Sequence, residues 1–452
     1  MRRGRLLLWG LALLALAGAP GATAQAPEKP DQALVLVGGR LIDGYGGPPL
    51  ENSVIVVRGN RIEAVGRVGE VAIPTGARVI STEGHTVLPG LMDMHVHLMI
   101  IGHADYDYWF RAYRDRWRDV IMPISAKQLL MAGVTSAVDL GGTLKESLSV
   151  RDRIKRGEIP GPRMWMSGPW ITRDLGDYSD ALPTQILVDT PAEAARAVDQ
   201  LADAGVDVIK AYVDMRPEHY RAIADAAHRR KLKVHAHVYD PVDVRNALEA
   251  GVDVLTHAGS AGTPPYDPGL VKAIAVKGTP VVITAAHRVW LFPATVDFPE
   301  RIQDPRLKHD FTPQLYEEVM NSLRNFHRLS YFATTDRQML YGKASLKQWI
   351  DAGVVMGMGT DSGTPLNFHT EALWREIKAH VDMGMSPARA ISAATRVGAD
   401  ILGRGADLGT IEPGKLADII VVNGNPLFDI VALANVETVV KGGVIYKGGG
   451  SR

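Results

Sequence analysis

Short apolar runs alternate with helix-like stretches through the middle of this chain, and this alternation limits the folds that the chain can adopt. Strands that alternate with helices predict a parallel sheet with helices packed outside it. About eight such units between residues 89 and 405 favour an α/β fold of the (β/α)8 barrel (TIM-type) class, with an open doubly wound sheet as the alternative. Four of these units are Pro191–Ala204 with Val206–Ile209, Glu218–Arg230 with Leu232–Ala236, Pro241–Ala250 with Val252–Thr256, and Asp267–Lys277 with Pro280–Thr284.

Both ends of the chain look different from this middle part. They contain short runs rich in β-branched residues, separated by glycine-containing turns. We expect residues 30–88 and 406–449 to fold together into one small β-sandwich, with a metal-dependent barrel of residues 89–405 inserted between them. The runs are Ala33–Val37, Ser53–Val57, Arg61–Val65, Leu416–Val422, Val436–Val440 and Gly443–Tyr446.

The first 24 residues are typical of a secretory signal peptide. Arg2, Arg3 and Arg5 form a basic start, and an apolar run covers 6–17. The small residues around Ala24 predict cleavage after that position. The apolar run is short for a transmembrane span. We therefore expect a secreted or periplasmic protein that has no membrane attachment after cleavage.

Composition excludes several kinds of site. The formal net charge is zero, which gives no electrostatic case for nucleic acid or an anionic membrane. The chain has no cysteine, so thiolate ligands, disulfides and a cysteine nucleophile are all excluded. Any metal ion must therefore be held by nitrogen and oxygen ligands.

A His-x-His pair ends the first apolar strand of the middle part. His95 and His97 follow the run that begins at Leu88, and residues two apart on a strand point to the same face. Neutral imidazole is the commonest protein ligand for metal ions. The pair is thus a candidate half-site, although two histidines at this spacing also occur on ordinary polar strand faces.

Four further residues with suitable chemistry end their own predicted strands. They are Lys210, His237, His257 and Asp361, with His235 as the alternative to His237. Each alone is typical of a satisfied polar side chain or, for the lysine, of a surface group. Because the carboxyl ends of parallel strands meet at one edge, the set together predicts a metal site, with a carbamate on an uncharged Lys210 as a further ligand.

At this point the chain resembles the amidohydrolase superfamily, and within it the imidazolonepropionase-like branch that includes metal-dependent Xaa-Pro dipeptidases. The resemblance covers nearly all of the chain after residue 24. It rests on Val87–His97, Ala132–Ser136, Gly205–Lys210, Ala236–Tyr239, Ala250–His257, Gly359–Ser362, Ala393–Thr395, Gly409–Asp418 and Asn425–Pro426.

The resemblance implies a binuclear site. His95, His97 and Asp361 would bind one metal ion, His237 and His257 the other, and carboxylated Lys210 would bridge them. Asp361 would also act as the catalytic proton carrier. One-metal relatives are similar in fold but lack the bridging lysine. Related dipeptidases show His-Ala-His-Gly where this chain has His237-Val238-Tyr239-Asp240, so the substrate contacts of this loop are open.

The predicted activity is hydrolysis of a C–N amide bond by metal-activated hydroxide, with Zn the default for both divalent ions. The first substrate class is a dipeptide or N-acyl amino acid with a free carboxylate. The alternatives are a lactone or cyclic-amide hydrolase and a non-catalytic binding protein.

Substrate specificity would lie in the loops that follow the strands. Tyr239, His287 and Arg288 are the candidate substrate-binding residues. An insertion at about Trp290–Lys347 predicts two extra helices that form part of the pocket wall. A homo-oligomer is also expected, although no single stretch of the sequence identifies an interface.

Overall fold

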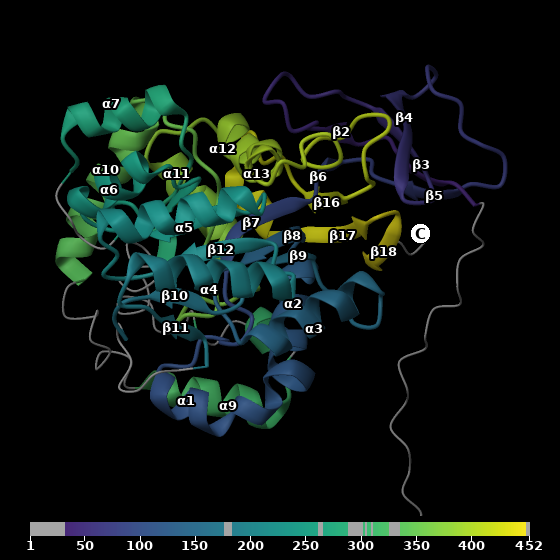
Figure 1. Ribbon diagram of the computed structural model, residues 1–452. Coiled ribbons are helices and arrows are strands. Elements are labelled where there is room, and N and C mark those ends of the chain that lie inside the picture. Colours follow the sequence, from purple (N-terminus) through teal and green to yellow (C-terminus); the bar gives the residue numbers. More distant parts are fainter. Residues whose placement is uncertain are drawn as a thin grey trace, which may run out of the picture.

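The computed structural model describes residues 32–175, 183–260, 265–287, 302, 305–308, 311–324 and 335–448. The predicted signal peptide at 1–24, Arg288 and the aromatic residues at 290–292 lie outside these residues. The described chain has α/β content with a β-rich part beside it (Figure 1). Within the described residues, no helix is both long enough and apolar enough to cross a bilayer.

The β-rich part contains two sheets, of four and five strands. The four-stranded sheet has the order β4-β3-β1-β5 and the five-stranded sheet the order β18-β17-β16-β6-β2. Residues from both sheets, such as Leu36 and Val421, share one apolar cluster. The strands are β1 (Leu34–Val37), β2 (Arg40–Leu41), β3 (Ser53–Arg58), β4 (Arg61–Arg67), β5 (Arg78–Ser81), β6 (His85–Pro89), β16 (Ile419–Asn423), β17 (Val436–Lys441) and β18 (Val444–Lys447).

The second of these sheets joins the two ends of the chain. β16 pairs antiparallel with β6, with Ile419 opposite Pro89 and Asn423 opposite His85. β6 leads through Gly90 directly into β7 (Leu91–Val96), the strand that carries His95. The C-terminal strand β16 therefore stabilises β6, which leads into the strand that carries His95.

The α/β part contains two parallel sheets. One has the order β7-β8-β9 and the other β11-β10-β12-β13-β14-β15. Helices lie outside these strands (Figure 1). The remaining strands are β8 (Val134–Asp139), β9 (Arg163–Met166), β10 (Trp170–Thr172), β11 (Gln185–Leu187), β12 (Val208–Ala211), β13 (Lys233–His237), β14 (Val254–Thr256) and β15 (Val281–Val282).

The helices begin and end at strong local signals. Thr190 and Glu193 form a capping box at the start of α4, and Gly205 ends it at φ 89°. α4 and α6 have the bounds that the sequence predicted, and α5 and α7 lie within one residue of them. The helices are α1 (Tyr106–Ala112), α2 (Met122–Met131), α3 (Leu144–Lys155), α4 (Pro191–Ala204), α5 (Pro217–Arg229), α6 (Pro241–Ala250), α7 (Pro268–Lys277), α9 (Pro313–Ser322), α10 (Thr335–Asp351), α11 (Ala372–Asp382), α12 (Pro387–Ala393) and α13 (Arg396–Ile401).

The segment 354–361 connects the two parallel sheets without forming a regular strand, so the expectation that Asp361 ends a strand is wrong in that respect. It makes single bridges, from Val281 to Met356 and from Val96 to Ser362. The amides of residues 360 and 361 both donate to the His95 carbonyl, at 3.2 and 2.8 Å, and this shared acceptor interrupts a ladder. The regular pairings therefore form two parallel sheets, and a closed eight-stranded barrel stays a prediction.

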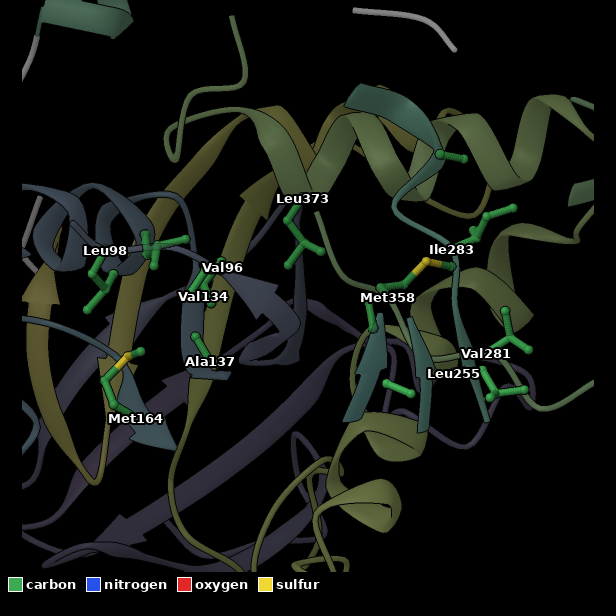
Figure 2. Close-up of a cluster of buried hydrophobic side chains, with 14 of the residues drawn as sticks. Val96, Leu98, Val134, Ala137, Met164, Leu255, Val281, Ile283, Met358 and Leu373 are labelled. Atoms are coloured by element: carbon green, nitrogen blue, oxygen red, sulfur yellow. The ribbon is translucent and has the colours of Figure 1, made fainter. Parts of the chain in front are cut away.

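Apolar side chains from both parallel sheets form the main core. Val96, Val134 and Ala137 pack on one side, and Leu255, Val281 and Met358 on the other (Figure 2). Burying apolar surface contributes roughly 25 cal/mol per Å². This core fixes the strand ends against one another and so fixes the side chains that follow them.

A substitution at Gly359 tests how closely the segment 354–361 packs against Val282 and His95. A Cβ atom there would lie 2.4 Å from Val282 Cγ1 and 3.0 Å from the His95 amide nitrogen. Gly359→Ala is expected to lower the free energy of unfolding by about 1–3 kcal/mol through overpacking. The measurement is urea unfolding, with Gly47→Ala as the control because a Cβ atom there meets nothing within 4 Å. Equal stability of the two variants would contradict this packing.

Candidate metal centre

The predicted ligands come from neighbouring strands at one edge of the two parallel sheets. His95 lies in β7 and His97 directly follows it, while His237 ends β13 and His257 follows β14. Lys210 was expected to end its strand but is the third of the four residues of β12. Asp361 ends the irregular segment 354–361. The backbone thus brings residues from distant parts of the sequence to one place.

Asp361 is the centre of the first group of contacts. Its Oδ1 lies 3.0 Å from His97 Nε2 and 3.5 Å from His95 Nε2. Ligand atoms of His95, His257 and Asp361 all lie within 4.8 Å of one another, and all three side chains are buried. This spacing is compatible with a shared metal ion.

The second group of contacts contains His237 and Lys210, and His257 connects it to the first group. Its ring centroid lies 4.5 Å from that of His95 and 4.5 Å from that of His237. Lys210 Nζ donates to Thr256 Oγ1 at 2.8 Å, beside His257. The six predicted ligands therefore form one continuous cluster.

The structure favours His237 over His235 as the β13 ligand. The His237 ring contacts the His257 ring, whereas His235 pairs with Lys210 in the ladder. His235 is 0% exposed, and burial lowers its pKa to about 3. Among the described residues neither ring nitrogen of His235 has a hydrogen-bond partner. His235 is thus a neutral, fully buried ring without a hydrogen-bond partner in the described part of the chain.

Burial dominates the electrostatics of the cluster. It lowers the pKa of His95 and of His257 well below the usual range, and nearby positive groups lower both further. Burial alone would raise the pKa of Asp361, but the hydrogen bond from His97 and the charges of the histidines lower it below its usual range. His95 and His257 are therefore neutral imidazoles beside an ionised Asp361 carboxylate, which is the state that binds a metal ion.

Lys210 is 1% exposed and forms no ion pair with any described residue. Burial lowers its pKa from 10.5 to about 7, because a desolvated ammonium is costly. A neutral amine is the form that adds to CO2. His95 Nδ1 is also buried without a partner within the described chain. The unpartnered nitrogen of His95, the neutral amine of Lys210 and the absence of cysteine fit an N/O-ligated divalent ion.

The backbone at the site is held in an unusual conformation. His257, Thr284 and Asp361 have positive φ angles of 67°, 54° and 59°. Such angles are uncommon outside glycine, and a β-branched residue such as Thr284 is an outlier. Strain of this kind persists only where surrounding contacts hold it, and it clusters at functional sites.

Sequence reasoning missed several residues that hold the ligands in place. Asp93 accepts hydrogen bonds from the His95 amide at 3.1 Å and from Thr360 Oγ1 at 2.7 Å. Thr284 Oγ1 lies 2.8 Å from His257 Nδ1. The position of Asp93 two residues before His95 was a usable signal, but nothing local marks Thr284.

Two of the three predicted substrate-binding residues lie at the cluster. The Tyr239 ring is 4.6 Å from the His237 ring and 5.6 Å from the His257 ring. His287 Nδ1 lies 4.0 Å from Asp361 Oδ2, and its Nε2 lies 3.1 Å from the Pro365 carbonyl. Arg288 is outside the described residues.

The sequence profile of the amidohydrolase family matches residues 86–446. The chain belongs to this family. The match includes all six predicted ligands and β16, the C-terminal strand that pairs with β6. The predicted resemblance is therefore confirmed.

Relatives over nearly the full length support this assignment. The ochratoxinase of Aspergillus niger is 26% identical, covering 92% of this chain and 87% of the relative. The imidazolonepropionase of Geobacillus kaustophilus is 26% identical, covering 88% of each chain. The crystal structure of a Xaa-Pro dipeptidase with bound methionine is similar at a TM-score of 0.71 and 27% identity, covering 92% of this chain and 100% of that one.

Family membership establishes the reaction class. The protein is a metal-dependent hydrolase that acts on C–N bonds, as the sequence predicted. Its substrates are small-molecule amides. The number of metal ions and the substrate itself require further argument.

The pKa of Lys210 gives a test on metal-free protein. Between pH 7 and 10.5 the unfolded chain binds this proton and the folded chain does not, so wild-type stability rises with pH across that window. Lys210→Met removes the cost of burying the amine. We expect the variant to have the larger free energy of unfolding at pH 7, with a difference that shrinks towards pH 10.

The measurement is urea unfolding of both proteins at several pH values after metal removal. Lys272→Met is the control because Lys272 is exposed on α7. A stability difference between wild type and Lys210→Met that stays constant from pH 7 to pH 10 would show that Lys210 does not titrate in this window.

Proposed function

We propose that the protein is a binuclear metal hydrolase that cleaves the amide bond of a dipeptide or an N-acyl amino acid with a free carboxylate. The observation that carries the proposal is the buried cluster in which His257 contacts both His95 and His237, beside a lysine with no acidic partner among the described residues. One ion would not use all of these donors, because structural and catalytic zinc sites take three or four protein ligands.

In this proposal the cluster divides into two sets. His95, His97 and Asp361 would hold one ion, and His237 and His257 would hold the other. Lys210 would supply oxygen ligands as a carbamate, formed when Nζ adds to CO2 and loses a proton. Burial supports this role because it lowers the pKa of Lys210 to about 7 and makes the neutral amine available. Zinc is the proposed metal, given the nitrogen and oxygen ligands.

When bound, the two ions supply an acidified water and a Lewis acid for the substrate carbonyl. The chain's own groups then handle the proton. Asp361 is ionised and its Oδ1 faces His95 and His97, so it can accept a proton at the site and deliver it to the leaving nitrogen. His287 Nδ1 lies 4.0 Å from the other oxygen, Oδ2.

The substrate class follows from the relatives and the residues beside the cluster. One similar structure is a Xaa-Pro dipeptidase with methionine bound in its active site. In this chain Tyr239 and His287 lie where substrate would meet the site. Arg288 remains our proposed partner for the substrate carboxylate, since arginine binds carboxylates in a bidentate way.

The fold proposed for this activity is a closed (β/α)8 barrel. Two hydrogen bonds support closure of the two parallel sheets into one. The Asp207 amide donates to the Met166 carbonyl at 2.9 Å beside β9 and β12, and the Met94 amide donates to the Met358 carbonyl at 2.8 Å. Ligands at the carboxyl ends of strands are the rule in that fold.

We also propose that the protein works outside the cytoplasm, in the periplasm or as a secreted enzyme. The support is the basic and apolar pattern of residues 1–24, which is typical of a signal peptide. Export would be tested by fractionating cells and sequencing the N-terminus of the mature protein. A mature chain that starts at Met1 would contradict it.

The proposed reaction is tested with a panel of substrates on the zinc-loaded protein. The panel contains dipeptides, N-acetyl amino acids, the same compounds with an amidated carboxyl group, and a γ-lactone. We expect kcat/KM to be at least about tenfold higher for the free acids than for their amidated counterparts, since a charge-assisted contact of this strength is lost. Faster hydrolysis of the lactone than of every amide would favour the alternative activity.

Asp361→Asn tests the proton role in the same assay. Its kcat is expected to fall by about 10²–10⁴-fold because an amide cannot accept the proton. Asp351→Asn is the matched control, since Asp351 lies exposed on α10 and pairs with Lys347. Near-normal turnover by Asp361→Asn would refute the role.

A further inference from the structure

A fully buried carboxylate lies behind the site and is not explained by the proposed reaction. Glu376 on α11 is 0% exposed. Burial raises its pKa to about 8, although hydrogen bonds from two backbone amides lower it. Burying such a group is costly unless it is fully hydrogen-bonded. Its hydrogen bonds therefore indicate what it does.

Both oxygens of Glu376 hold the turn that follows β15. The amide of Ala285 donates to Oε1 at 3.0 Å, and the amide of Ala286 donates to Oε2 at 2.6 Å. His380, one turn further along α11, lies with Nδ1 2.9 Å from the Glu376 backbone carbonyl and 3.5 Å from Oε1. The carboxylate thus fixes two successive peptide groups.

The residues on either side of these two amides contact the candidate metal centre. Thr284 precedes them, and its Oγ1 lies 2.8 Å from His257 Nδ1. His287 follows them, and its Nδ1 lies 4.0 Å from Asp361 Oδ2. Thr284 has a φ of 54°, which a threonine adopts only when its surroundings impose it.

We infer that Glu376 is a positioning residue that orients His257 and His287 by holding the turn 284–287. The inference rests on the proposed function, in which His257 holds a metal ion. With the proton on Nδ1, His257 donates to Thr284 Oγ1, and this hydrogen bond fixes the ring orientation and leaves the unprotonated Nε2 to bind the ion. Outer contacts of this kind typically change metal affinity or activity by 10–100-fold when they are lost.

Glu376→Gln is the first test. The glutamine amide keeps the size of the side chain but turns a donor NH2 group towards one of the two backbone N–H groups. We expect the affinity for Zn²⁺, measured by competition with a chelator, to fall by about 10–100-fold. Ile377→Ala is the matched control, because Ile377 is buried on the same helix. It is expected to lower the melting temperature and leave Zn²⁺ affinity unchanged.

A double variant tests whether Glu376 acts through Thr284. Thr284→Val removes the hydroxyl group at His257 and keeps the side-chain shape. If both residues act on His257 by one route, Glu376→Gln with Thr284→Val loses no more Zn²⁺ affinity than the worse single variant. Glu376→Asp keeps the carboxyl group but is too short to reach both amides, and it replaces Glu376→Gln if that variant does not fold.

Two outcomes would overturn the inference alone. One is wild-type Zn²⁺ affinity in the Glu376 variant. The other is full additivity of the losses of Zn²⁺ affinity in the Glu376 and Thr284 variants, which would show that the two residues act on Zn²⁺ binding independently. A wild-type protein that takes up no Zn²⁺ would overturn the proposed function as well, so the two failures are distinguishable.

Discussion

The contact of Asp361 with His95 and His97 is the interaction on which the rest of the structure depends. It places a carboxylate within 3.0 and 3.5 Å of two imidazole nitrogens in the interior of the protein. Charged and polar groups at this depth are stable only when they are paired or bind metal ions. Asp93 connects the two segments that carry these residues. Its Oδ1 accepts a hydrogen bond from the His95 amide, and its Oδ2 accepts one from Thr360 Oγ1, next to Asp361.

The chain ends contribute to these contacts indirectly. The pairing of β16 with β6 fixes the strand that leads into β7, so the C-terminal residues stabilise the entry to the metal centre. On the opposite side, α11 reaches the turn after β15 through Glu376. The site is thus held by elements far from it in sequence, which explains why strained backbone persists at His257 and Thr284.

Local pattern predicted α4, α5, α6 and α7 to within one residue, since their periodicity and caps are visible over a few residues. It also predicted that His95, His237 and His257 lie together, because parallel strands end at one edge. It failed at the segment 354–361, where a shared acceptor at the His95 carbonyl breaks the ladder. It gave no sign of Glu376 or Thr284, because their roles arise from contacts between distant elements. Lys210 proved to lie inside β12, within the usual uncertainty of strand ends.

The most direct test of the account is the metal content of the purified wild-type chain. The protein would be stripped of metal, reloaded with Zn²⁺ and freed of excess ions before elemental analysis. A buried cluster of five ligands with a carbamate on Lys210 predicts about two ions per chain. About one ion would contradict the shared binuclear site and return Lys210 to a structural role. No uptake would contradict the catalytic account of the cluster.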